Sequence, residues 1–135
     1  MKISRVVWIT VIGAFAVILF DAIASIASRA LGFPYARASV GSYFLYLAIG
    51  FAAGRHAATS RARSGAIAAA IAGFADVSVG WAVSWQIGPG RPPSGMITPM
   101  QWWLVAVFVL LFAAAIGFFG GVVGARSRPV AIAPS

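Results

Sequence analysis

Residues 65–87 read GAIAAAIAGFADVSVGWAVSWQI, an apolar run interrupted by a single acidic residue, Asp76. The run is long enough to cross about 30 Å of bilayer hydrocarbon as an α-helix, which takes about 20 residues. Helical spacing places small side chains on the same face as Asp76, at intervals of three and four residues; they are Gly65, Ala69, Gly73, Gly80 and Ser84. Because helices in lipid pack closely where small residues line up, this face predicts a helix interface that contains a carboxyl group.

Three further apolar runs flank this segment, at about residues 6–28, 34–54 and 101–124. The chain is 61% hydrophobic and 9% charged, whereas soluble domains carry about 25% charged residues. None of the runs has the period-two alternation of a membrane β-barrel strand. We therefore predict an all-α integral membrane protein: one four-helix bundle domain over residues 1–125, followed by a short mobile tail over residues 126–135.

The net charge of +8 comes from basic residues at the ends of the apolar runs. This arrangement lacks the basic face of a nucleic-acid-binding protein, so we expect no nucleic-acid partner. One side of the predicted bundle collects more basic residues than the other: Lys2, Arg5, Arg55, Arg61, Arg63, Arg126 and Arg128, against Arg29, Arg37 and Arg91. The positive-inside rule then predicts cytoplasmic termini, with the basic side near anionic lipid headgroups. The excess of arginine over lysine and the abundance of alanine suggest a bacterial chain, so we expect it in the bacterial inner membrane.

The first apolar run has a second interpretation, a cleaved signal peptide. MKISR is a basic start, residues 6–20 are apolar, and AIA at 22–24 fits a cleavage site. Apolar and small residues continue to Ser28, however, which favours a retained membrane helix. Cleavage would leave three membrane spans and an outside N-terminus, so both outcomes remain open at this stage.

A short internal similarity joins the second and fourth runs. AIGFAAG at 48–54 and AIGFFGG at 115–121 agree in most positions, and both precede a basic stretch. Two helical hairpins in the same orientation would form a parallel repeat with an axis along the membrane normal. The alternative is chance, because Ala, Gly, Ile and Phe dominate this composition.

The second acidic residue, Asp21, lies in the equally apolar segment VILFDAIAS. Its helical neighbours are also small, so both acids are predicted to face protein or a cavity rather than lipid. Side chains at comparable depth could support them through hydrogen bonds or charge, namely Ser25, Arg29, Arg37, Tyr43, Tyr46 and Ser78. The glycines predicted to bring helices together are Gly50, Gly54, Gly73, Gly80, Gly117 and Gly121.

Two functions follow from these two acids. The first is a non-catalytic accessory, assembly or oligomeric membrane subunit, in which Asp21 and Asp76 fix helix packing. The second is a small proton-coupled transporter or channel that uses both as proton or cation sites, because intramembrane acids commonly serve ion pathways. The chain has no cysteine, one histidine (His56) and no recognisable catalytic motif, so we expect no enzyme activity, metal or cofactor. Expected partners are the lipid bilayer and either further copies of the chain or other membrane subunits.

Overall fold

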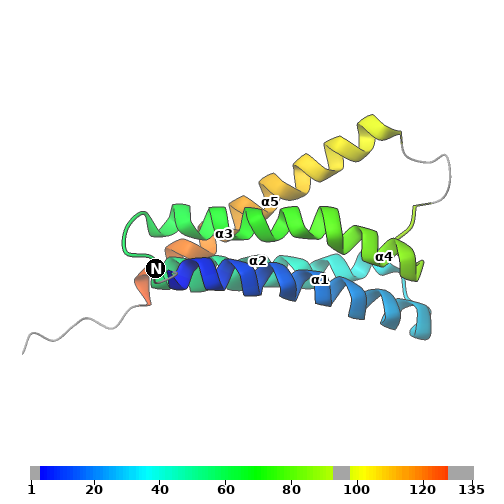
Figure 1. Cartoon of the computed structure of the whole chain (residues 1–135), viewed down its shortest axis with the longest axis horizontal. Coiled ribbons are helices and arrows are strands. Elements are labelled where there is room, and N and C mark those ends of the chain that lie inside the picture. The colour runs from blue at the N-terminus through cyan, green and yellow to red at the C-terminus, as the bar shows by residue number, and fades with distance from the viewer. Residues whose placement is uncertain (1–3, 93–97, 128–135) are drawn as a thin grey trace, which may run out of the picture.

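The computed structural model describes residues 4–92 and 98–127, which are helical apart from short connections and contain no β-strand. The elements are α1 (Arg5–Leu31), the 3-10 turn η1 (Tyr35–Ala38), α2 (Ser39–His56), α3 (Arg61–Ala75), the π-helical turn η2 (Asp76–Gly80), α4 (Trp81–Ile87) and α5 (Pro99–Arg126). The segments α3, η2 and α4 form one continuous helix. The four long helices run alternately up and down (Figure 1).

Three helices are long and apolar enough to cross a membrane: α1, the continuous helix of α3 to α4, and α5. They contain 27, 27 and 28 residues. The α2 helix has 18 residues, which corresponds to about 27 Å, and it ends in the polar pair Arg55 and His56. The prediction of a membrane helix bundle is therefore confirmed for three of the four predicted spans.

The second helix begins later than the sequence suggests. We expected it to start at Pro34, but residues 35–38 form a 3-10 turn and α2 begins at Ser39. Gly32 ends α1 in the left-handed conformation, at φ 72°, and Pro34 then continues in an extended conformation. The tighter 3-10 turn connects the reversal of the chain after α1 to the start of α2.

The other helices extend slightly beyond their predicted limits. The third begins at Arg61 rather than Gly65, and the fourth runs from Pro99 to Arg126. A capping box fixes the start of α5, because the Thr98 backbone N–H donates to Gln101 Oε1 at 2.8 Å and the Gln101 N–H donates to Thr98 Oγ1 at 3.3 Å. The predicted mobile tail lies mostly outside the described residues, as does the centre of the proline-rich connection, residues 93–97.

Glycines bring α2 and α5 together at their backbones. A Cβ atom added at Gly50 would lie 2.5 Å from the Cα atom of Gly117, and one at Gly54 would lie 2.5 Å from the Cα atom of Gly121. No side chain fits in such a contact. These are the equivalent positions of the two similar heptapeptides, AIGFAAG and AIGFFGG. The similarity thus coincides with a crossing point, while the parallel repeat itself stays a prediction.

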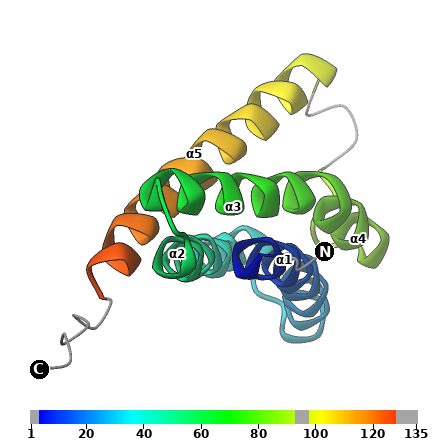
Figure 2. The same cartoon turned by 60° about the vertical axis from the view of Figure 1, so that its left-hand side comes forward.

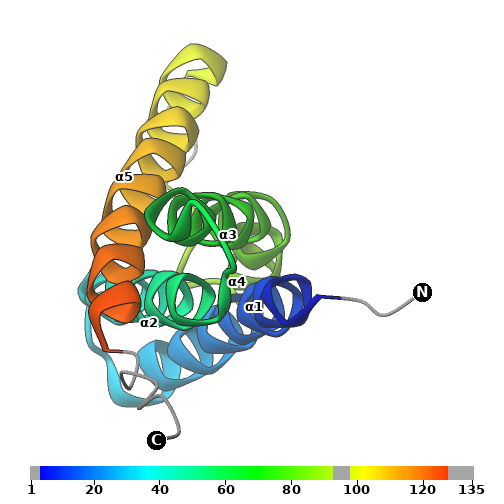
Figure 3. The ribbon, with the colours of Figure 1, turned by 90° about the vertical axis from the view of Figure 1, so that its left-hand side faces the viewer.

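The α5 helix crosses the bundle obliquely. Its second half packs on α2 and α3, and its first half diverges from them, as all three views show (Figures 1, 2 and 3). Large apolar side chains in the diverging half are exposed, including Trp103, Leu104, Phe108 and Leu111. The interior lies among α1, α2, α3 and the second half of α5, around Val17, Tyr46, Ile49 and several alanines, including Ala113 of α5.

Candidate functional site

The two acidic side chains of the chain meet inside the bundle. Asp21 comes from the middle of α1 and Asp76 is the first residue of η2, and they are only 4% and 5% exposed. Both line one cavity of about 140 Å³. Their carboxyl groups are close enough for a proton to link them by a hydrogen bond. We refer to Asp21 and Asp76 as the carboxyl pair and to this space as the carboxyl cavity.

Each acid accepts a hydrogen bond from one tyrosine. The phenolic hydroxyl of Tyr46, a fully buried residue of α2, donates to Asp76 Oδ2. The hydroxyl of Tyr35, on η1, donates to Asp21 Oδ1 at 3.1 Å. Burial, reinforced by the neighbouring Asp21, raises the pKa of Tyr35 to about 12, so this phenol keeps its proton at physiological pH. The tyrosines thus occupy one oxygen of each carboxyl group.

The remaining oxygen of Asp21 has no partner among the described residues. Asp21 Oδ2 is fully buried and accepts no hydrogen bond. Gly80 provides the space that it occupies, because a Cβ atom there would overlap Asp21 Oδ2 and lie 3.3 Å from Asp76 Oδ1. Two carboxylates this close cannot both remain negative without a proton or a cation between them. The side chains that interact electrostatically with Asp21 include Asp76, Tyr35 and Tyr46.

A π-helical turn shapes this part of the third span. In η2 the backbone N–H of Trp81 reaches back to the carbonyl oxygen of Asp76, five residues earlier. Such single π-turns within α-helices are frequent at functional sites. Here the turn keeps Asp76, Gly80 and Ser84 buried on one face, although it contains an extra residue compared with an α-helical turn. The packing face that the sequence predicted therefore continues through the turn.

The carboxyl cavity lies toward the end of the bundle that carries η1. Its lining residues come from six elements and are Asp21, Tyr35, Ala36, Ser39, Ser42, Tyr43, Tyr46, Asp76, Trp81 and Val109. It reaches the surface beside η1, where Ala36 and Ser39 are exposed. On the other side of the carboxyl pair the interior is filled by a buried apolar cluster that includes Val17, Ile49 and Ala72.

The polar residues proposed from the sequence divide into two groups. Tyr46 and Tyr43 line the cavity, although only Tyr46 donates to an acid, while the Tyr43 ring packs edge-on against Phe112 at 5.0 Å. Ser25 is buried without a hydrogen bond, next to the Tyr35 hydroxyl. Ser78 is exposed, and its hydroxyl donates to the Phe74 carbonyl of its own helix at 2.5 Å.

The two arginines proposed as counter-ions lie away from the carboxyl pair. Arg29 Nη1 donates to the carbonyl oxygen of Ile87 at 3.2 Å and so ties the end of α1 to the end of α4. Arg37 is exposed on η1. Among the proposed packing glycines, Gly73 faces Ala113 of α5, whose Cβ atom would be 2.9 Å from a Cβ added at Gly73.

Sequence reasoning missed Tyr35 and Trp81. Tyr35 was placed at the start of a helix, whereas the 3-10 turn directs its hydroxyl to Asp21. Its position directly after Pro34, at a helix boundary, was the one available signal. Trp81 lies five residues after Asp76, and that spacing does not share a face in an α-helix. The π-turn brings Trp81 to the cavity wall.

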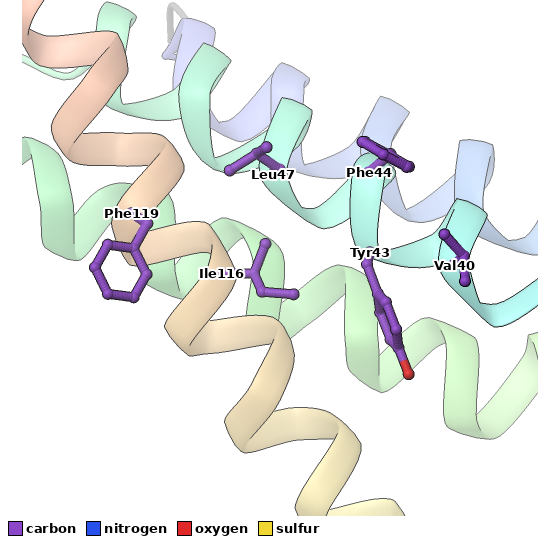
Figure 4. Close-up of a pocket in the computed structure, with 6 residues that line it drawn as sticks. All are labelled: Val40, Tyr43, Phe44, Leu47, Ile116 and Phe119. Carbon is purple, nitrogen blue, oxygen red and sulfur yellow. The ribbon is translucent and has the colours of Figure 1, made fainter.

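Two larger hollows of the described surface are apolar, and neither is lined by Asp21 or Asp76. One groove of about 340 Å³ lies between α2 and α5, lined by Val40, Tyr43, Phe44, Leu47, Ile116 and Phe119 (Figure 4). A second groove of about 460 Å³ continues along the same helices, past Phe51 and Gly120. Apart from the Tyr43 hydroxyl, these side chains offer no polar group, so the chemistry of the molecule is concentrated at the carboxyl pair.

No family model matches this sequence, and comparisons with curated proteins and with solved structures also give no match.

Proposed function

We propose that this chain is a small proton-coupled transporter of the bacterial inner membrane and that the carboxyl pair is its proton and cation site. In this proposal α2 is the fourth span, antiparallel to its neighbours, and both termini face the cytoplasm. The α2 helix packs against α1, α3 and α5, which supports a place inside the membrane bundle despite its shorter length. The cavity mouth beside η1 then faces outward.

The observation that carries this proposal is the pairing of Asp21 with Asp76 in one buried cavity. A carboxyl group in the middle of a membrane helix costs about 2.5–3.5 kcal/mol on insertion scales. Placing two of them together, with one oxygen unpartnered, adds repulsion that a single structural acid would not have. A proton or cation that binds between them removes that cost, which is the behaviour required of an exchange site.

The position of the carboxyl cavity near one end of the bundle favours a carrier over a channel. The carboxyl cavity reaches the surface at the η1 end, whereas the opposite side is closed by buried Val17, Ile49 and small residues. A continuous pore through one copy of the chain would need an opening on both sides. A carrier instead exposes its site to one side at a time, which agrees with a cavity that lies near one end.

A second candidate function remains, the accessory or oligomeric membrane subunit. Its supporting observation is the hydrogen bonding of the acids to Tyr35 and Tyr46, which links α1 to η1 and η2 to α2. The diverging half of α5 also leaves apolar side chains free to contact lipid or another subunit. In that case the carboxyl pair holds the helices in register and exchanges no ion.

Proton movement in reconstituted vesicles distinguishes these functions. The purified chain is placed in vesicles that contain a trapped pH-sensitive dye, and a gradient of Na⁺, K⁺ or an organic ammonium ion is imposed in turn, because an exchange site moves protons only against a counter-ion. We expect proton flux above that of protein-free vesicles, and we expect Asp21→Asn and Asp76→Asn to lower it to the protein-free level. Ser78→Ala is the matched control, because Ser78 lies in the same π-turn but bonds only to its own helix.

Infrared spectra supply an independent measurement on the same variants. The chain has only two acidic side chains, so a protonated-carboxyl band that responds to pH and disappears in the double Asn variant belongs to this pair. Flux that equals the protein-free level in the wild type would refute transport and favour the accessory function. Flux that persists in both folded Asn variants would refute the carboxyl pair as the transport site.

A further inference from the structure

A second cavity adjoins the carboxyl cavity. It has a volume of about 180 Å³ and lies among α4, the start of the following connection and α5. Tyr35 and Trp81 line both cavities, so these two side chains form the partition between them. The other aromatic residues of the second cavity are Trp85 and Trp102, and we call it the tryptophan cavity.

The three tryptophans of this cavity form one cluster. The centroid of the Trp102 ring of α5 lies 4.1 Å from that of the Trp81 ring and 4.7 Å from that of the Trp85 ring, at interplanar angles of 49° and 47°. The rings are therefore tilted rather than stacked in parallel. Tryptophan faces attract cations more strongly than those of any other side chain, and most strongly in desolvated surroundings. The cluster thus adds an attraction for positive charge beside the carboxyl pair.

The chemistry of the two cavities together selects a type of cation. Divalent metals prefer six or more oxygen ligands for Ca²⁺, or an octahedral set for Mg²⁺, and no group of three or more metal-binding His, Cys, Asp or Glu side chains occurs in the described residues. An aromatic wall beside a carboxylate instead suits an organic ammonium ion, which carries its charge within an apolar shell. Drug-sized ligands occupy roughly 300–1,000 Å³, so cavities of about 140 and 180 Å³ select a small ion.

We propose that the carboxyl cavity and the tryptophan cavity form one binding site for a small organic ammonium ion. The unpartnered Asp21 oxygen, in a side chain that is 4% exposed, is the group that receives the charge. This proposal rests on the proposed function and names its cargo. The ion passes the tryptophan cluster, displaces the partition formed by Tyr35 and Trp81, and pairs with the carboxyl groups.

Binding of the ammonium ion is an exchange with a proton. Before binding, one proton is shared between Asp21 and Asp76. When the ammonium ion enters, that proton leaves to water, so one positive charge replaces another and no covalent bond to the ion forms or breaks. Low pH therefore weakens ammonium binding. The other titratable side chains that line the carboxyl cavity are Tyr35, Tyr43 and Tyr46, while α4 and α5 contribute Trp81 and Val109, which do not titrate.

Tetramethylammonium is the probe that tests this site. Calorimetric titration of the full chain in detergent measures binding, and a pH indicator in weak buffer measures proton release. We expect saturable binding with about one proton released per ion, by the exchange of one charge for another. The uncharged isostere tert-butanol and potassium chloride are the two ligand controls, and neither is expected to release protons.

Variants separate the contributions of charge and ring. Asp21→Asn and Asp76→Asn should abolish proton release. Trp81→Leu should weaken binding about three- to thirtyfold, the range of a desolvated cation–π contact. If Trp81→Leu fails to fold, Trp102→Phe is the second variant. It keeps an aromatic ring and should weaken binding less than Trp81→Leu. Trp8→Leu is the matched control, because Trp8 is 54% exposed at the opposite end of α1.

Each outcome decides the proposal. If tert-butanol bound as tightly as tetramethylammonium, the site would be an apolar cavity only. If potassium released as many protons as tetramethylammonium, the site would be a general cation site. Either result would overturn the organic cargo, while vesicle proton flux could still support transport. Unchanged tetramethylammonium binding in both the Trp81→Leu and Trp102→Phe variants would also overturn it. Loss of vesicle flux, in contrast, tests the transport function itself.

Discussion

At the scale of single residues, the two acids accept hydrogen bonds from tyrosines that lie in different surroundings. Tyr46 is 1% exposed and donates to Asp76, whereas Tyr35 lies at the cavity mouth and donates to Asp21. Asp21 also retains the unpartnered oxygen. The pair is therefore asymmetric: Asp76 is anchored to the bundle interior, and Asp21 faces the side from which an ion would enter.

Removing the Tyr46 hydroxyl should destabilise the bundle. Tyr46→Phe leaves Asp76 Oδ2 without its donor, and hydrogen bonds between membrane helices contribute about 0.6–1.7 kcal/mol. We expect that loss in the free energy of unfolding, measured by titration with a denaturing detergent. Tyr43→Phe is the control, because the Tyr43 ring packs against Phe112 and its hydroxyl donates to neither acid. Equal stability of both variants would show that the Tyr46 contact contributes nothing.

At the scale of helices, glycine positions set how closely α2 and α5 approach. Gly50 and Gly54 meet Gly117 and Gly121 backbone to backbone. This contact holds the second half of α5 on the bundle, while the first half, which lacks an equivalent run of small residues, diverges (Figure 2). The π-turn η2 also determines the geometry of the bundle, because it places both Asp76 and Trp81 at the wall of the carboxyl cavity.

Substituting one of these glycines should force the helices apart. In Gly50→Ala the new methyl group would lie 2.5 Å from the Gly117 Cα atom, which cannot rotate away. Overpacking of this kind costs about 1–3 kcal/mol. Gly41→Ala is a matched control on the same helix, because the three atoms nearest to its methyl group would belong to the ring of Phe20, a side chain that can move. Titration with a denaturing detergent should give the Gly50 variant a clearly lower free energy of unfolding than the Gly41 variant. The reverse order would contradict the close contact between Gly50 and Gly117.

At the scale of the whole molecule, the helix ends and the connection that carry most of the basic residues lie at the same end of the bundle. The start of α1, the α2–α3 connection and the end of α5 are at one end of the bundle, and η1 and the end of α4 are at the other (Figure 1). Arg5, Arg55, Arg61 and Arg126 belong to the first end, and Arg29, Arg37 and Arg91 to the second. Four spans with the first end in the cytoplasm agree with this distribution.

Single cysteines can test that topology, because the chain has none of its own. Thr59→Cys and Ser127→Cys lie at the basic end, Ala30→Cys lies at the opposite end, and all three positions are exposed. In intact cells a membrane-impermeant maleimide should label the cysteine at position 30 alone, and the other two only after lysis. If α2 did not cross the membrane, positions 30 and 59 would be labelled alike.

The sequence alone determined that this chain forms helices long and apolar enough to cross a membrane, and which face of the helices that contain Asp21 and Asp76 is buried. The length of the apolar runs determines the helices. The spacing of small residues around Asp21 and Asp76 determines the buried face, because a helix repeats its face every three to four residues. Only the tertiary structure brought Asp21 to Asp76, turned Tyr35 inward from a 3-10 turn, and placed Trp81 beside them through a π-turn. Contacts between helices depend on how backbones approach and where a turn departs from the α-helix, and neither is encoded in the period of a single helix.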